Sequence, residues 1–207
     1  MRIGIFGGSF DPVHLGHVKL AKEVIESGCA DRVVFIPAAK QPFKLDRKMA
    51  DGTDRLNMVK LAIEGEDNLE ASSYELDRAG EISYTVNTLN AMQEFYGQDT
   101  EIALIQGADS FLQIHTWTRA EEILKKFIII VGVRPGYKED EVAAQEEFLK
   151  NEYGARIIHV DNPCVNISST EIRDEILAEQ SVISCDGCIN MIPEKVKEYI
   201  IEKGLYN

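Results

Sequence analysis

The chain has 207 residues, a mass of 23.2 kDa and 44% hydrophobic residues, enough for one domain around a single apolar core. Its 35 Asp and Glu residues outnumber its 22 Lys and Arg residues, and the net charge is −13. Such an acidic surface repels a phosphate backbone, so the composition disfavours duplex DNA or tRNA as a partner. It does not exclude a small anionic substrate, which is influenced mainly by the charges of its own pocket.

Neither a membrane span nor a secretion signal is expected. The longest apolar run, residues 127–133, has the length of a strand, whereas a spanning helix needs about 18 uncharged residues or more. The first residues, MRIGIFGGSF, carry one basic side chain and continue directly into a motif, unlike a signal peptide. We therefore expect a cytoplasmic protein without a membrane partner.

The four cysteines do not form a recognisable framework. Cys29 and Cys164 stand apart, and Cys185 and Cys188 have the spacing of half a zinc site. A tetrahedral zinc site needs a second pair of ligands, which the sequence does not supply. Ordinary thiols around an Asp-Gly turn are therefore favoured, and no protein metal site is predicted.

Apolar runs and helical patterns alternate along the chain. In chain order we expect a strand at residues 2–10, a helix at 15–27, a strand at 32–38, a helix at 54–64, a strand at 69–76, a helix at 85–95, a strand at 101–109, a helix at 120–126, a strand at 127–136, a helix at 139–152, a strand at 155–160, and helices at 168–179 and 194–204. Continuously apolar strands that alternate with helices are typical of a parallel sheet covered on both faces. The sequence therefore predicts an α/β fold with a Rossmann-like open parallel sheet.

One domain is expected over residues 1–207, with the C-terminal helical part, about residues 168–207, packed on it. In open α/β sheets, ligands bind outside the carboxyl ends of the strands. The segments that this rule places around one cleft are residues 7–17, 37–44, 107–109, 134–136 and 168–173.

The stretch GGSFDPVHLGH, residues 7–17, follows the first strand and opens the first helix. Gly7 and Gly8 allow the backbone to approach a ligand closely, and the amides at a helix start form an anion site. The third glycine of the dinucleotide fingerprint is missing. His14 and His17 can donate to phosphate oxygens, although either histidine alone would be taken for a loop residue or a helix cap.

A second motif, NISSTEIRDEIL, lies near the end of the chain. Ser168, Ser169 or Thr170 can cap a helix here, which leaves N-terminal amides and hydroxyls to hold an anion. Arg173, one turn further on, can bind two phosphate oxygens with its planar guanidinium. Alone, this motif would be an ordinary capped helix with a surface arginine.

Other stretches suit a flat, electron-poor ring that carries a carboxylate. The amides of Tyr84 and Thr85, in SYT at a helix start, are placed to hold a carboxylate. Asp109 ends a strand, and Trp117 can stack on a pyridinium ring through a cation–π contact, although a core position is the alternative for this tryptophan. The loop after the second strand carries Lys44 over the cleft.

Together these motifs resemble a known superfamily. GGSFDPVHLGH is similar to the HxGH signature of the nucleotidylyltransferases, which are related to the nucleotide-binding domain of class I tRNA synthetases, and ISSTEIR is similar to their C-terminal phosphate-binding element. With SYT and GADSFLQIHTW, the chain resembles the bacterial type of nicotinate-nucleotide adenylyltransferase over most of its length. It departs from that pattern at Phe43-Lys44, where a His-Lys pair is expected, and at Thr118, where an aromatic residue often follows the tryptophan.

The resemblance implies that ATP and nicotinate mononucleotide give nicotinate adenine dinucleotide (deamido-NAD) and pyrophosphate, with Mg²⁺ on the ATP phosphates, in NAD biosynthesis. The catalytic residues that it implies are His14, His17, Lys44 and Arg173. The implied ATP-binding residues are Gly7, Gly8, Ser9, Phe10, His14, His17, Gly107, Asp109, Ile167, Ser168, Ser169, Thr170 and Arg173. The implied mononucleotide-binding residues are Ser9, Lys44, Tyr84, Thr85, Asp109, Trp117 and Arg134.

Other functions stay open. A related enzyme would use nicotinamide mononucleotide or phosphopantetheine, or would transfer a cytidylyl group, and Trp117 argues against acceptors without a pyridine ring. A nucleotide-binding sensor without catalysis is the alternative of another class, against which His14, His17 and Arg173 argue. The sequence leaves open the preference for nicotinate over nicotinamide and the formation of a homo-oligomer.

Overall fold

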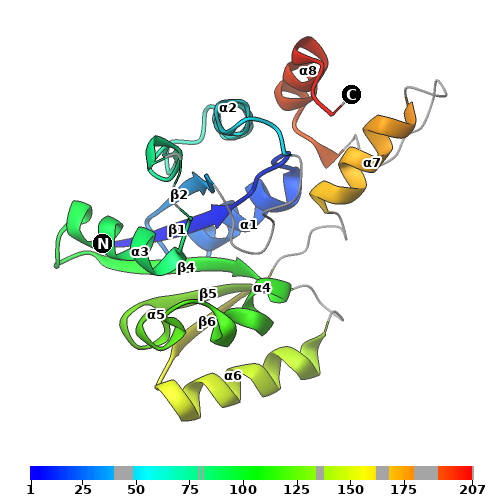
Figure 1. Ribbon diagram of the computed structural model, residues 1–207. Helices are drawn as coiled ribbons and strands as arrows, with labels where there is room; N and C mark the ends of the chain where they lie inside the picture. Colours follow the sequence, from blue (N-terminus) through cyan, green and yellow to red (C-terminus); the bar gives the residue numbers. More distant parts are fainter. Residues whose placement is uncertain are drawn as a thin grey trace.

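The computed structural model describes residues 1–39, 49–78, 80, 82–133, 138–161, 168–179 and 191–206. In this part of the chain, six parallel strands form one sheet in the order β3-β2-β1-β4-β5-β6 (Figure 1). The strands are β1 (Arg2–Gly8), β2 (Arg32–Pro37), β3 (Leu69–Ala71), β4 (Glu101–Gly107), β5 (Ile128–Val133) and β6 (Arg156–Asp161). The α/β class and the parallel sheet predicted from the sequence are confirmed.

Helices connect the strands and form the tail of the chain. They are α1 (Leu15–Glu26), α2 (Gly52–Ala62), α3 (Thr85–Tyr96), α4 (Ala108–Gln113), α5 (Ala120–Lys126), α6 (Glu139–Tyr153), α7 (Ser169–Glu179) and α8 (Glu194–Lys203), with short 3₁₀ helices η1 (Leu76–Arg78) and η2 (Ile114–Thr116). Among the helices described, none has the length and apolar character needed to cross a membrane.

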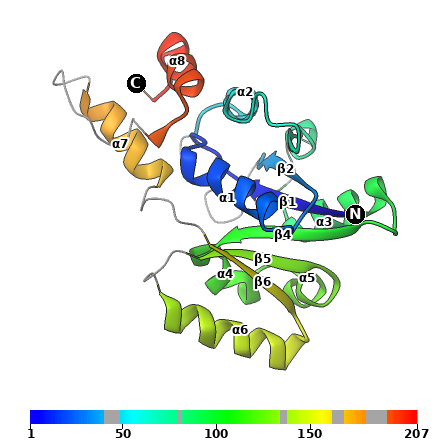
Figure 2. The same cartoon turned by 180° about the vertical axis from the view of Figure 1, so that it is seen from behind.

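The helices cover both faces of the sheet because side chains alternate along its strands. Along β4, Ala103 and Ile105 belong to a core shared with α1, α2 and the tail helices, whereas Ile102 and Leu104 belong to a second core shared with α3, α4, α5 and α6. Figures 1 and 2 show α1 on one side of the sheet and α3 on the other. We call these sides the α1 face and the α3 face.

One strand is shorter than the sequence predicts. The strand expected over residues 69–76 ends at Ala71. Ser73 donates its hydroxyl to the Asp77 carboxylate at 2.7 Å and accepts from the Asp77 amide at 2.9 Å, which turns the chain into η1. Local side-chain hydrogen bonds of this kind compete with a strand ladder.

A short helix was not predicted. The strand expected over residues 101–109 ends at Gly107, and α4 and η2 follow it. Phe111 and Ile114 lie three residues apart, and both are fully buried in the second core. This packing holds a helix too short to show a clear sequence period. Residues 134–136 of the strand expected over 127–136 lie outside the described residues, and β5 ends at Val133.

The strand order changes direction between β1 and β4. From β1, the chain runs through β2 to β3 at one edge, and from β4 it runs through β5 to β6 at the other edge. The crevice at the carboxyl ends of the strands on either side of such a point is the usual ligand site of open α/β sheets. Gly7 and Gly8 of β1 and Gly107 of β4 lie at these carboxyl ends.

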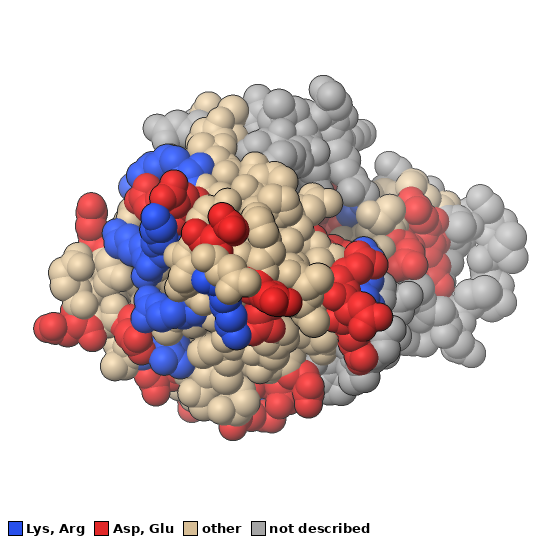
Figure 3. Space-filling view, turned by 90° about the horizontal axis from the view of Figure 1, so that it is seen from below, with Lys and Arg blue, Asp and Glu red and all other residues tan. Residues whose placement is uncertain are grey.

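Positive and negative side chains are mixed on the surface. Figure 3, seen from the side of α6, shows Lys and Arg side chains gathered toward one edge with Asp and Glu side chains among them. The ion pairs of the structure include those of Arg2 and Arg156, whose guanidinium groups lie 3.0 and 3.6 Å from the Glu101 carboxylate. Much of the positive charge is therefore locally balanced.

Arg55, on α2, connects the loops at the carboxyl ends of β1 and β2. The residue is 2% exposed, and its guanidinium donates to the carbonyl oxygens of Ser9, Ala38 and Ala50 at 2.8, 2.8 and 3.0 Å. Burial lowers the pKa of Arg55, and the nearby Asp11 carboxylate opposes that shift. The buried guanidinium thus fixes both loops relative to α2.

Replacing Arg55 by Met should lower the free energy of unfolding by about 2–4 kcal/mol, because its three carbonyl partners lose their donor and an unsatisfied buried group costs about 1–3 kcal/mol. Urea denaturation measures the change. Lys60→Met on the same helix is the control, because Lys60 is exposed and surface substitutions usually change stability by less than about 0.5 kcal/mol. Equal losses in the two variants would show that Arg55 does not hold the loops.

Candidate active site

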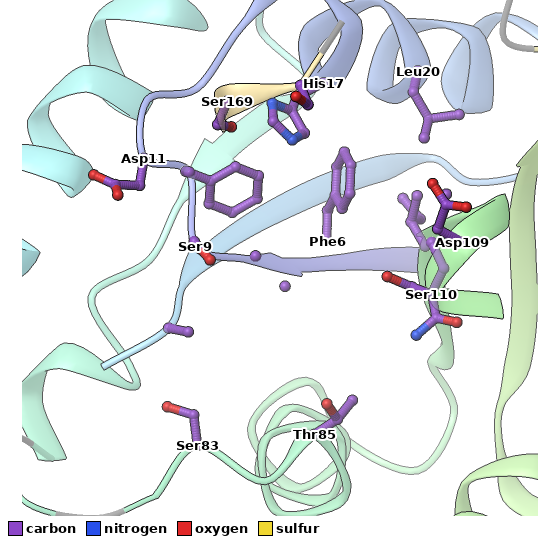
Figure 4. Close-up of a pocket in the computed structure, with 18 of the residues that line it drawn as sticks. Phe6, Ser9, Asp11, His17, Leu20, Ser83, Thr85, Asp109, Ser110 and Ser169 are labelled. Atoms are coloured by element: carbon purple, nitrogen blue, oxygen red, sulfur yellow. The ribbon is translucent and has the colours of Figure 1, made fainter. Parts of the chain in front are cut away.

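A cavity of about 610 Å³ lies at the carboxyl ends of β1 and β4. In Figure 4, His17 and Ser169 lie close together on one side, Ser83 and Thr85 lie across from them, and Asp109 forms part of a third side. The first side is built by the β1–α1 loop, α1 and the start of α7, and the opposite side by the start of α3. Segments from both ends of the chain therefore share one cavity, at the point where the strand order changes direction.

The two histidines of the first motif are fixed against each other. The amide of His14 donates to Nδ1 of His17 at 3.2 Å, and the two rings stack with centroids 3.7 Å apart. The edge of Phe10 packs against the His17 ring at 5.1 Å. A Cβ at Gly8 would lie 2.9 Å from the Phe10 ring, so glycine is required for this close approach. Because Nδ1 of His17 accepts a hydrogen bond, its Nε2 carries the proton in the neutral ring.

Asp11 joins the first motif to the end of the chain. Its Oδ1 accepts from the Ala50 amide at 3.1 Å and from the Tyr206 hydroxyl at 2.8 Å. Its Oδ2 lies 3.5 Å from Nη1 of Arg173, which also donates to the Asp11 carbonyl oxygen. The Asp11 side chain is buried and points away from the middle of the cavity in Figure 4. It therefore holds Arg173 against the first motif from behind.

Arg173 is not a surface residue. It is 8% exposed and lines the cavity, with Nη2 donating to the Thr170 hydroxyl at 3.3 Å. The alternative of an ordinary capped helix with a surface arginine is therefore wrong. A guanidinium carries five N–H donors, so its contacts with Asp11 and Thr170 are compatible with a further anion contact on the cavity side.

The start of α7 differs from the expectation in one respect. Ser168 and Glu171 form a reciprocal cap, in which the amide and hydroxyl of Ser168 donate to Glu171 at 2.7 and 2.8 Å. The Ser169 hydroxyl donates to the Pro12 carbonyl at 2.9 Å. Both serine hydroxyls, expected to hold an anion, are therefore used inside the protein: that of Ser168 caps α7, and that of Ser169 docks α7 on the first motif. Anion contacts at this point are left to backbone amides and to Arg173.

The opposite wall carries the residues expected to hold a flat ring. Tyr84 is the N-cap of α3, whose first residue is Thr85. Trp117 is partly buried, packs against the second core and also lines the cavity, beside Thr118. Asp109 lies 3.1 Å from the Lys138 ammonium, with 61% of its side chain exposed. The core position and the cavity position considered for Trp117 are thus compatible.

Glu75 forms hydrogen bonds that connect the segments of this wall. Its Oε1 accepts from the Thr88 hydroxyl of α3 at 2.6 Å, and it lines the cavity near Ser83, whose hydroxyl accepts from the Ala39 amide at 3.1 Å. Burial raises the pKa of Glu75, and hydrogen bonds from Ser83, Thr88 and the Ala39 amide oppose that shift. The carboxyl group links the ends of β2 and β3 to the start of α3.

Most of the site residues predicted from the sequence meet in this cavity. Those that line it are Gly7, Gly8, Ser9, Phe10, His14, His17, Tyr84, Thr85, Gly107, Asp109, Trp117, Ser168, Ser169, Thr170 and Arg173. Three predicted site residues lie outside the described part of the chain: Lys44, Arg134 and Ile167. Phe43, Cys185 and Cys188 also lie outside it. The roles assigned to all of these residues stay predictions.

Asp11, Glu75, Gln106 and Tyr206 are among the residues that border or support the site without a role assigned to them from the sequence. Gln106 leaves a sequence signal, as an amide inside the apolar run IALIQG, and Asp11 lies within the first motif. The contacts of Asp11, Glu75 and Tyr206 join distant segments, which the sequence does not display.

No protein cage for a metal ion is found within the described residues, where no three His, Cys, Asp or Glu side chains come together. Mg²⁺ that enters on a polyphosphate needs few protein ligands, because it keeps several waters and takes substrate phosphates with one or two carboxylates. The lining of the cavity thus fits an ion that is held mainly by substrate phosphates and water.

The chain is similar to known proteins in sequence and in fold. The family model described as cytidylyltransferase-like matches residues 5–175. A relative from Caldicellulosiruptor saccharolyticus, named "Probable nicotinate-nucleotide adenylyltransferase", is 40% identical over 100% of this chain and 99% of its own. A relative of the same name from Clostridium novyi is 36% identical over 98% of each chain. The structure of Plasmodium falciparum nicotinic acid mononucleotide adenylyltransferase complexed with NaAD has a TM-score of 0.74 at 20% identity, over 99% of this chain and 97% of that one, which supports the fold.

Replacing Tyr206 by Phe should lower the free energy of unfolding by about 1–2 kcal/mol, because Asp11 loses a buried hydrogen-bond donor. Burial and the Asp11 carboxylate both raise the pKa of Tyr206, so the phenol remains the donor at neutral pH. Tyr153→Phe is the matched control, since no described residue hydrogen bonds to that hydroxyl, and Tyr153 packs on the second core. Chemical denaturation of both variants tests this link, and a Tyr206→Phe protein as stable as the control would disprove it.

Replacing Glu75 by Gln should change stability in a pH-dependent way. Because the folded pKa of Glu75 is raised, the stability it confers is present below the unfolded pKa and is lost as pH rises through the folded pKa. The Gln variant lacks this loss, so its stability relative to the wild type should increase between pH 4 and pH 8. Unfolding free energies at several pH values measure the difference. A difference that stays constant or falls with pH would contradict the raised pKa.

Proposed function

The chain belongs to the cytidylyltransferase-like family and, within it, to the nicotinate-nucleotide adenylyltransferases, and we propose that it transfers the adenylyl group of ATP to nicotinate mononucleotide. The products are nicotinate adenine dinucleotide and pyrophosphate. The reaction belongs to NAD biosynthesis and takes place in the cytoplasm. One observation carries the proposal: His14, His17 and Arg173, from opposite ends of the chain, line the same cavity as Thr85 and Trp117.

The reaction needs positioning more than proton transfer. The 5′-phosphate oxygen of the mononucleotide is anionic at neutral pH and attacks the α-phosphorus of ATP in line, without a general base. Catalysis then depends on orientation and on neutralising charge in the transition state. The Nε2 proton of His17, set by the hydrogen bond at Nδ1, is the donor that meets the α-phosphate, and His14 stacks behind it.

The leaving pyrophosphate lies toward α7. Arg173, held by Asp11, presents its guanidinium to the β- and γ-phosphates, and the backbone amides at the start of α7 add a helix N-terminus for the same anion. Lys44, which lies outside the described residues, is expected from the resemblance to steady these phosphates. Bound with ATP, Mg²⁺ neutralises charge on the phosphate oxygens.

The mononucleotide occupies the opposite wall. The amides of Tyr84 and Thr85 at the start of α3 hold the nicotinate carboxylate, because a helix N-terminus favours an anion. Trp117 stacks on the pyridinium ring. Asp109 binds ribose hydroxyls, and Ser9 and Arg134 complete the contacts. Gly7, Gly8, Phe10 and Gly107 shape the floor on which the adenine nucleotide lies.

The direct test is a product assay. Purified protein is incubated with Mg-ATP and either nicotinate or nicotinamide mononucleotide, and the dinucleotide and pyrophosphate are quantified. We expect equal amounts of dinucleotide and pyrophosphate with nicotinate mononucleotide. Pyrophosphate without dinucleotide, or no turnover with either acceptor, would refute the proposal.

Replacing His17 by Ala should lower kcat by about 10²–10³-fold, the usual loss when a transition-state donor is removed, while the fold survives the loss of one acceptor for the His14 amide. The control is His115→Ala, because His115 is exposed, bonds to Gln145 and does not line the cavity. Steady-state kinetics of both variants provide the measurement. Turnover near that of the wild type in His17→Ala would remove this residue from the mechanism.

A further inference from the structure

We propose that Gln106 is a specificity-determining residue, whose carboxamide hydrogen bonds to the substituent on the pyridine ring of the mononucleotide. This inference rests on the proposed function and adds a contact to it. It concerns a residue in the middle of the sheet rather than in any of the motifs.

Gln106 is a buried polar side chain whose carboxamide oxygen is an unused hydrogen-bond acceptor among the described residues. The residue is 4% exposed, and its Oε1 is buried without a partner among the described residues. Such a group costs stability unless it is satisfied, and buried polar groups in native proteins are nearly always paired. Gln106 also lines the cavity. A buried amide whose oxygen has no partner among the described residues, and which borders a binding cavity, is placed to bind a ligand.

The position of Gln106 on the sheet indicates which of the two substrates it would contact. Side chains two residues apart on a strand point to the same face, so Gln106 shares its face with Leu104 and Ile102. Both of those residues pack with α3 and α4 in the second core. The α3 face is the side that carries Thr85 and Trp117, whereas α1, with His17, packs on the other face. Gln106 therefore borders the mononucleotide half of the cavity.

The chemistry of a carboxamide suits the group that distinguishes the two pyridine mononucleotides. Its NH₂ can donate to the carboxylate of nicotinate, and its oxygen can accept from the amide of nicotinamide. No described residue donates to the carboxamide oxygen of Gln106. Glutamine at this position can therefore bind either substituent, while glutamate can only accept and would repel a carboxylate.

A first test separates this role from a structural one. Gln93 is the matched control, because its Nε2 donates to the carbonyls of Gly97 and Thr100, both at 2.9 Å. Gln93→Met should lower the melting temperature by several degrees. Each hydrogen bond contributes about 1 kcal/mol, and in a chain of this size a loss of about 1 kcal/mol lowers the melting temperature by about 2–4 °C. Gln106→Met should leave the melting temperature unchanged or raise it, because the Gln106 oxygen has no partner to lose among the described residues. A comparable loss in both variants would mean that Gln106 serves the fold, and would overturn the inference.

A second test measures selectivity. Gln106→Met should raise KM for nicotinate mononucleotide about tenfold, the effect of one hydrogen bond to a charged group, with KM for ATP unchanged. At pH 8, Gln106→Glu should shift the ratio of kcat/KM values about tenfold or more toward nicotinamide mononucleotide. An unchanged KM for the mononucleotides in Gln106→Met, or an equal effect of Gln106→Glu on both mononucleotides, would overturn the inference.

The experiments distinguish a failure of the Gln106 inference from a failure of the proposed function. A wild-type protein that turns over neither mononucleotide refutes the proposed function. In that case, calorimetric binding of each mononucleotide to the wild type, Gln106→Met and Gln106→Glu makes the same comparison without turnover. Binding that is equal in all three proteins would refute the role of Gln106.

Discussion

The buried carboxylate of Asp11 is the contact on which the arrangement of the site depends. It lies within the first motif and receives a hydrogen bond from Tyr206, 195 residues away, and an ion pair from Arg173, 162 residues away. The Ala50 amide adds a third segment at 3.1 Å. A single acidic side chain thus brings the N-terminal motif, the start of α2 and the C-terminal tail to one point. Arg173 faces the cavity as a consequence of this contact.

The sheet divides the cavity into two chemically different halves. On the α1 face, the stacked pair of His14 and His17 and the guanidinium of Arg173 supply donors suited to a polyphosphate. On the α3 face, a helix N-terminus at Thr85 and the ring of Trp117 suit a flat ring with an anionic group. Two substrates bound to these halves would meet above the carboxyl ends of β1 and β4.

Local sequence patterns were sufficient to predict the strands and most of the helices, because apolar periodicity reports burial directly. The meeting of His14, His17 and Arg173 in one cavity was also predictable, from their motifs and from the rule that ligands bind at the carboxyl ends of strands.

The strand order was not predictable from the sequence, because it depends on long-range pairing. The helix α4 was missed because it is short, and the capping of Ser168 by Glu171 was missed because a motif does not show which of its donors are already used. The links from Asp11 to Tyr206 and Arg173 join residues that share no local pattern.

The central claim is that both ends of the chain bind one polyphosphate, with the pyridine ring on the opposite wall. A crystal structure with a non-hydrolysable ATP analogue and nicotinate mononucleotide tests it most directly. The account predicts an α-phosphate oxygen within about 3 Å of Nε2 of His17, the β- and γ-phosphates at Arg173, and the pyridine ring between Thr85 and Trp117. A triphosphate bound away from Arg173, or a pyridine ring on the α1 face, would contradict it.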